Sequence, residues 1–82
     1  MTYWANAITE NGEDLWTYTA YDTEEECLNA FDIWGKSNSI KMAWVTVNAD
    51  DGTYRYNYIK TPTGWVCKNA WKMINKNDRP VE

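Results

Sequence analysis

The sequence of 82 residues contains no histidine and only two cysteines. Without histidine, the chain cannot build a Ser-His-Asp triad, a Cys-His dyad or a Cys/His zinc site. General acid-base catalysis would then depend on a tuned carboxylate, lysine or tyrosine in a cleft, and a domain of this size has little room for one. We therefore expect no enzymatic activity, no cofactor and no metal site.

Long apolar runs are also missing, since no segment approaches the roughly 18 apolar residues that suit a membrane-spanning helix. The opening residues, MTYWANAITE, lack the basic and apolar regions of a signal peptide. These features predict a cytoplasmic protein with no membrane partner. Disulfides are rare in the cytoplasm, so we interpret Cys27 and Cys67 as buried thiols that pack as small hydrophobic groups. A disulfide between the two cysteines stays open as an alternative.

Positive charge is absent from the first part of the chain. Residues 1–35 contain eight acidic residues and no Lys or Arg, whereas residues 36–82 contain all eight basic residues and four acids. The formal charges of the two parts, −8 and +4, add up to the net charge of −4. Such asymmetry indicates either a charged partner or attraction between the two parts within the fold.

Aromatic residues, in contrast, are abundant, with six Trp, six Tyr and one Phe. A chain of this length suits a single compact domain, residues 1–82, which buries roughly 60–65% of the surface of its unfolded form. Much of its small core must come from rings, each of which buries about 150–250 Å². We expect some of the rings to remain partly on the surface.

The first residues predict a β-hairpin. Asn11-Gly12 favours a two-residue type I′ turn within a hairpin over residues 2–21. The resulting register pairs Ile8 with Leu15, so that Leu15 lies on the same face as Ile8 and Trp16 lies on the opposite face.

A helix is predicted next, over residues 23–35, TEEECLNAFDIWG. Thr23 suits the N-cap, Glu26 completes a capping box with it, and Gly35 suits the helix end. Four residues recur at helical spacing and form the expected buried stripe: Cys27, Ala30, Phe31 and Trp34.

A second hairpin is predicted around the turn Asp51-Gly52. Its predicted register pairs Val45 with Tyr58 and places Tyr56 and Tyr58 beneath the helix. Tyr54, close to the tip of the hairpin, is expected to be more exposed.

The remaining residues complete the expected fold. WVCK, residues 65–68, predicts a short fifth strand, and NAWKMINKN, residues 69–77, predicts a short C-terminal helix. The predicted fold class is α+β in the order ββαβββα, with an antiparallel sheet of two hairpins plus the fifth strand and one helix packed on a face.

Two groups of residues are candidates for binding a protein partner. The first is a set of carboxylates that would form one acidic patch from the first turn and the helix start: Glu10, Glu13, Asp14, Asp22, Glu24 and Glu25. The second is the sheet face away from the helix, together with the tip of the second hairpin: Trp4, Ile8, Leu15, Trp44, Ile59 and Tyr54. Clustered exposed aromatic residues mark interaction surfaces. The alternative is that the predicted C-terminal helix covers this face.

Direct binding of single-stranded nucleic acid is the main alternative function. Lys68, Lys72 and Lys76 would form one stripe on a C-terminal helix, beside Trp and Tyr rings on which bases could stack. The net negative charge works against attraction of a phosphate backbone. Sugar binding by exposed rings is a further alternative.

In architecture, the chain resembles the small phage-encoded inhibitors of bacterial defence, notably the anti-CRISPR proteins. The resemblance rests on chain length, the acidic hairpin, the helix TEEECLNAF and the aromatic strands AWVTVN, TYRYNYIK and GWVCK. It implies a protein of the host cytoplasm whose carboxylates stand in for nucleic-acid phosphates in the basic groove of a defence protein. No residue role is carried over from the resemblance.

Overall fold

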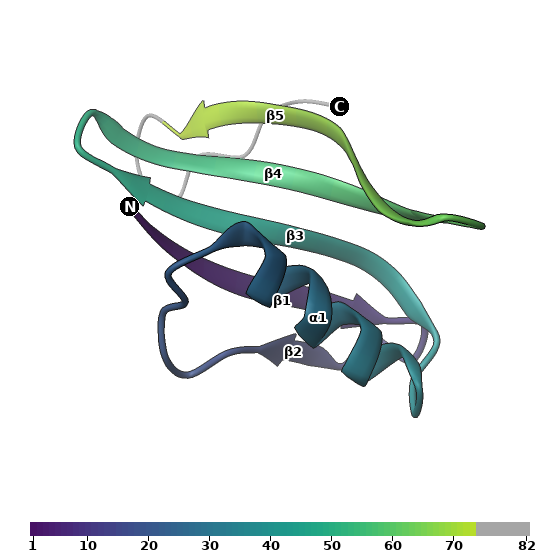
Figure 1. Ribbon diagram of the computed structural model, residues 1–82. Helices are drawn as coiled ribbons and strands as arrows, with labels where there is room; N and C mark the ends of the chain where they lie inside the picture. Colours follow the sequence, from purple (N-terminus) through teal and green to yellow (C-terminus); the bar gives the residue numbers. More distant parts are fainter. Residues whose placement is uncertain (74–82) are drawn as a thin grey trace.

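In the computed structural model, which describes residues 1–73, one helix packs on an antiparallel sheet (Figure 1). The elements in chain order are β1 (Thr2–Thr9), β2 (Asp14–Trp16), α1 (Glu24–Gly35), β3 (Ile40–Ala49), β4 (Gly52–Thr61) and β5 (Gly64–Met73). The strand order across the sheet is β2-β1-β3-β4-β5. The predicted α+β class, with two hairpins joined through a helix and followed by a fifth strand, is confirmed.

Both predicted ends of α1 are confirmed. Thr23 is the N-cap, and its hydroxyl oxygen accepts a hydrogen bond of 3.3 Å from the backbone N–H of Glu26. The Thr23 hydroxyl in turn donates to Glu26 Oε1 at 3.1 Å, so the two side chains of the capping box hold each other. The helix ends at Gly35.

The core lies between α1 and the central strands. Its strand side is built mostly from small or β-branched residues, and its helix side from the predicted stripe: Ala5, Ala7, Ala43, Val45, Val47 and Tyr58 face Cys27, Ala30 and Phe31. Phe31 is fully buried, and its ring centroid lies 5.2 Å from that of Trp65, 5.8 Å from Tyr58 and 6.1 Å from Trp34. The alanines on the strands leave room for this cluster of rings.

The predicted register of the first hairpin is wrong by one residue. The loop contains three residues, 10–12, because the backbone N–H of Thr9 donates to the carbonyl oxygen of Glu13 at 2.9 Å. Gly12 has a φ of 86°, whereas Asn11 has a negative φ, so a type I′ turn does not form. Leu15 therefore pairs with Ala7 on the helix side and packs against the core, and Trp16 moves to the other face.

The second hairpin has its predicted faces but not its predicted pairs. Asp50 and Asp51 form the turn, and Tyr58 pairs with Ala43 instead of Val45. A shift of two residues keeps every side chain on its face, because side chains alternate with a period of two. Tyr58 is buried beneath the helix as predicted, and Tyr56 is half-buried there. Tyr54 is also half-buried, and its hydroxyl donates to Asp51 Oδ2 at 2.6 Å.

The predicted C-terminal helix is wrong for its first five residues. Residues 69–73 belong to β5, where Trp71 pairs with Arg55 and Met73 pairs with Thr53. The ten-residue strand β4 offers backbone donors and acceptors along its whole length, and pairing satisfies more of them than a short isolated helix would. Residues 74–77, the rest of that predicted helix, lie outside the described residues.

The two cysteines differ in their surroundings, and both are free thiols. Cys27 is buried as predicted, whereas Cys67 is exposed, contrary to prediction. The reason is the position of α1, which covers β1 and β3 and leaves the same face of β5 uncovered (Figure 1). Burial, together with the nearby carboxylates of Glu24 and Glu26, raises the pKa of the Cys27 thiol to about 12.

Candidate protein-binding surface

The face of the sheet opposite α1 has the composition of a protein interface. No other described element covers this face, which we call the open face. The registers place these residues on it: Trp4, Asn6, Ile8, Asp14, Trp16, Met42, Trp44, Thr46, Asn48, Thr53, Arg55, Asn57, Ile59, Val66, Asn69, Trp71 and Met73. Among these described residues there is no Lys or Glu. Interface cores are likewise enriched in Trp, Met and Arg and depleted in Lys and Glu.

On the β3–β4–β5 side of the open face, the tryptophan rings already have a cationic neighbour. The guanidinium of Arg55 lies 4.3 Å from the ring centroid of Trp44 and 5.6 Å from that of Trp71. Arg55 Nε also donates to Asn57 Oδ1 at 2.9 Å, and Asn57 Nδ2 donates to Asn69 Oδ1 at the same distance. These contacts fix the polar groups between the rings and make this part of the face preorganised.

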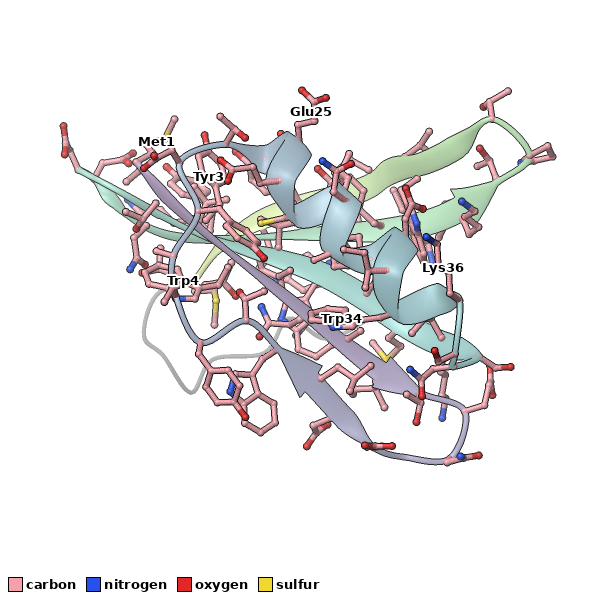
Figure 2. The ribbon with its side chains drawn as sticks, turned by 60° about the horizontal axis from the view of Figure 1, so that its bottom comes forward. Met1, Tyr3, Trp4, Glu25, Trp34 and Lys36 are labelled. Atoms are coloured by element: carbon pink, nitrogen blue, oxygen red, sulfur yellow. The ribbon has the colours of Figure 1, made fainter. Side chains whose placement is uncertain are left out.

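At the other side of the sheet, next to β2, large apolar side chains project into solvent. Trp16 is 51% exposed, Tyr18 is 88% exposed and Ile33 on α1 is 63% exposed. The rings of Trp16 and Tyr18 meet edge to face, with centroids 5.8 Å apart. Together with Tyr21 and Trp34 we call these residues the aromatic edge. Figure 2 shows the side chain of Trp34 between the helix and the strands, where it packs against the core.

The chain segment that carries Trp16 and Tyr18 is held to β1 on both sides. The backbone N–H of Thr17 donates to the carbonyl oxygen of Ala5 at 3.1 Å, and the Ala5 N–H donates to Thr17 Oγ1 at 3.2 Å. Tyr21 exchanges two backbone hydrogen bonds with Tyr3, at 2.7 and 3.0 Å. The exposed rings are therefore presented by an anchored segment, which lowers the ordering cost of binding.

Two hollows flank Trp16. One has a volume of about 320 Å³ and lies between β2, the following segment and α1, lined by Trp16, Thr17, Tyr18, Thr19, Tyr21, Ala30, Ile33 and Trp34. The other has a volume of about 270 Å³ and opens on the open face, lined by Asn6, Ala7, Ile8, Asp14, Leu15, Trp16 and Trp44. Trp16 contributes to both hollows and so joins the aromatic edge to the open face.

The predicted acidic residues do not form one patch. Glu10, Glu13 and Asp14 surround the β1–β2 turn, which lies beside the end of α1, because the Glu10 N–H donates to the carbonyl oxygen of Ser39 at 2.8 Å. The second acidic group lies at the start of α1, at the same end of the molecule as Tyr3 (Figure 2). The helix of 12 residues between these ends is about 18 Å long.

The second acidic group consists of Asp22, Glu24 and Glu25. All six predicted carboxylates are exposed except that of Glu24, which is half-buried and whose pKa is raised by that burial. Because residues 15–21 run between the two groups, the aromatic edge lies between two clusters of negative charge. The structure thus separates the predicted patch into two parts with apolar residues between them.

Of the six predicted residues of the second group, four lie on the open face, and Tyr54 lies on the helix side, where it pairs with Val47. Trp4, Ile8 and Trp44 are half-buried there, and Ile59 is 45% exposed beside its cross-strand neighbour Val66. Leu15 lies on the other face, as the corrected register requires. The prediction missed Trp16, although a three-residue loop that ends in glycine is also compatible with the sequence Glu10-Asn11-Gly12 and would have placed Trp16 correctly.

The predicted lysine stripe does not form on β5. Lys72 points to the helix side of the sheet, where it pairs with Tyr54, and Lys68 is the extra residue of a β-bulge. Lys76 lies outside the described residues. Lys60 is bound instead within the fold, with Nζ 3.3 Å from Asp32 Oδ1 and 5.5 Å from the ring centroid of Trp65. Trp65 Nε1 donates to the same Asp32 oxygen at 3.0 Å.

Within residues 1–73, no three His, Cys, Asp or Glu side chains gather in a way that could hold a metal ion. No helix in the described part of the chain is long and apolar enough to cross a membrane. No family model matches the chain, and neither a curated protein nor a solved structure matches it. The surface of the chain itself is therefore the guide to its function.

Proposed function

We propose that this chain is a small protein-binding module that docks through the aromatic edge and the adjoining part of the open face next to β2. The observation that carries the proposal is the exposure of Trp16, Tyr18 and Ile33 as one group beside two hollows. Tryptophan and tyrosine are enriched among the residues that dominate binding energies. An apolar group of this kind at the surface of a small domain is typical of an interaction site.

The charges around the aromatic edge indicate the kind of partner surface. The two acidic clusters lie on either side of the edge, and residues 1–35 supply no positive charge to neutralise them. Charges at the rim of an interface act mainly by steering the partner during encounter. The complementary partner surface is apolar at its centre and carries Lys or Arg on both sides.

We extend this proposal to an inhibitory function. Surfaces with flanking Lys and Arg are typical of proteins that bind nucleic acid. A module that covers such a surface would compete with the nucleic acid for it, as the resemblance to anti-CRISPR proteins implies. The separated acidic clusters would contact two sites on the partner, and the aromatic edge would supply most of the affinity.

Affinity capture with matched variants tests the proposal. The baits are the native chain, the variant Trp16→Ala/Tyr18→Ala and a control, Ile59→Ala/Val66→Ala, which removes exposed apolar groups at a distance from β2. We expect a bacterial protein that the native chain and the control retain and the edge variant loses. Equal retention by the edge variant would contradict docking at the aromatic edge.

Two further measurements define the class of partner. Displacement of the captured protein by added nucleic acid would support competition for a shared surface, and capture that nucleic acid leaves unchanged would contradict the inhibitory part. The nucleic-acid alternative is tested with a fluorescent single-stranded oligonucleotide at low salt. Tight binding that Lys68→Glu/Lys72→Glu abolishes, with the edge variant unaffected, would favour that alternative.

A further inference from the structure

We propose that the hollow of the aromatic edge receives an arginine side chain of the protein partner. This inference rests on the proposed function and specifies the group that the site recognises. The hollow has a volume of about 320 Å³ and four aromatic residues in its lining: Trp16, Tyr18, Tyr21 and Trp34. The faces of aromatic rings attract cations that lie within about 6 Å of the ring centroid.

The chain shows elsewhere how its tryptophans interact with cations. Arg55 lies over Trp44 and Trp71, and Lys60 lies over Trp65. Within residues 1–73, no such contact falls on the rings that line the hollow. Residues 1–35, which supply the whole lining of the hollow, contain no Lys or Arg. No cation of the described residues lies over these rings, so the described part of the chain leaves them accessible to a cation of another molecule.

Carboxylates near the hollow favour the same occupant. Glu26 lies one helical turn before Ala30, which is part of the lining, so both residues lie on the same side of α1. Asp22 directly follows Tyr21, another lining residue, and both carboxylates are on exposed residues. A positively charged group in the hollow would thus have rings around it and carboxylates on residues next to those of the lining.

Arginine fits this surrounding better than lysine does. Its guanidinium is planar, stacks on aromatic faces and is more weakly hydrated than an ammonium group, so it loses less on leaving water. Its donors also form strong, charge-assisted hydrogen bonds with carboxylates. The predicted partner residue is therefore an arginine that projects from the protein surface.

A peptide titration followed by NMR tests this inference directly. The probe is acetyl-Gly-Arg-Gly-amide, and the matched control contains citrulline, which has nearly the same shape without the charge. We expect the arginine peptide to shift the indole N–H signals of Trp16 and Trp34, assigned with Trp16→Phe. The citrulline peptide should bind roughly three- to thirtyfold more weakly, the range that cation–π energies allow. The lysine peptide should fall between the two.

Variants that remove exposed rings give a second measurement. Tyr18→Ala should weaken binding of the arginine peptide, whereas Ile59→Ala should leave it unchanged, and both side chains are exposed enough for the fold to survive their loss.

Equal binding of the citrulline and arginine peptides, shifts confined to Trp44 and Trp71, or no shift in the millimolar range would overturn the inference. If the peptide fails while partner capture still depends on Trp16, only the arginine is wrong. If capture does not depend on Trp16, the proposed function fails as well.

Discussion

The two halves of this small sheet use tryptophan in opposite ways. On the side of β4 and β5, rings are covered by cations from the chain itself, as Arg55 and Lys60 show. On the side of β2, the rings of the aromatic edge stand among carboxylates, and Trp16 and Tyr18 face solvent. The difference teaches that ring content alone does not mark a binding surface. What distinguishes the two halves is whether the described part of the fold already provides a cation over the rings.

The largest expected contrast between the halves is in thiol labelling. Cys27 is buried on α1, whereas Cys67 on β5 is exposed. In the native protein, the alkylating reagent should react quickly with Cys67 only. The rate at Cys27 should be lower by roughly a thousandfold or more, because the reagent reaches this thiol only when the core opens. Its pKa of about 12 slows it further. Mass spectrometry after timed alkylation measures both rates, and similar rates would show that α1 does not cover Cys27.

The next largest effect concerns the residue that joins the halves. Phe31 contacts Trp34 on one side and Tyr58 and Trp65 on the other. Phe31→Ala should lower the free energy of unfolding by about 3–5 kcal/mol, because it opens a cavity in the core. Ile33→Ala, at an exposed position of the same helix, is the control and should change it by less than about 1 kcal/mol. Equal losses in denaturant titrations would contradict the described packing.

Charge reversal is expected to have a smaller effect, and it compares how the acidic and the basic part of the molecule contribute to the association rate. Changing Glu10, Glu13 and Asp14 to lysine should lower the association rate with the captured partner about tenfold or more and flatten its salt dependence. The control Lys68→Glu/Lys72→Glu changes the other half and should alter the rate much less. Association rates measured at several salt concentrations, by stopped flow or surface plasmon resonance, distinguish these outcomes. A larger effect of the lysine changes would move the interface to the basic half.

The features that the sequence predicted well depend on neighbours along the chain. Thr23 and Glu26 define the start of α1 through contacts within one turn, so local chemistry is sufficient there. The face of Tyr56 and Tyr58 was also predictable, since an error of two residues in register does not move a side chain to the other face.

The features that it predicted poorly depend on contacts between distant segments. Asn11-Gly12 fits loops of two or three residues, and only the complete set of backbone hydrogen bonds around Thr9 and Glu13 selects the longer loop. That single residue decides whether Trp16 is in the core or in the candidate site. Residues 69–73 have a composition that fits a short helix, but the free edge of β4 turns them into strand. The acidic residues were identified individually, whereas their separation depends on where α1 lies.

The bulge in β5 has a consequence for the behaviour of this protein at high concentration. A straight strand of ten residues at the border of a sheet invites the strands of other molecules to add on and grow a fibre. Here the bulge at Lys68 divides β5 into two short pieces, and the extra residue carries a charge that an added strand would have to accommodate. The opposite border, β2, is only three residues long. A chain so rich in rings can thus offer exposed rings to the proposed partner while both borders of its described sheet discourage self-assembly.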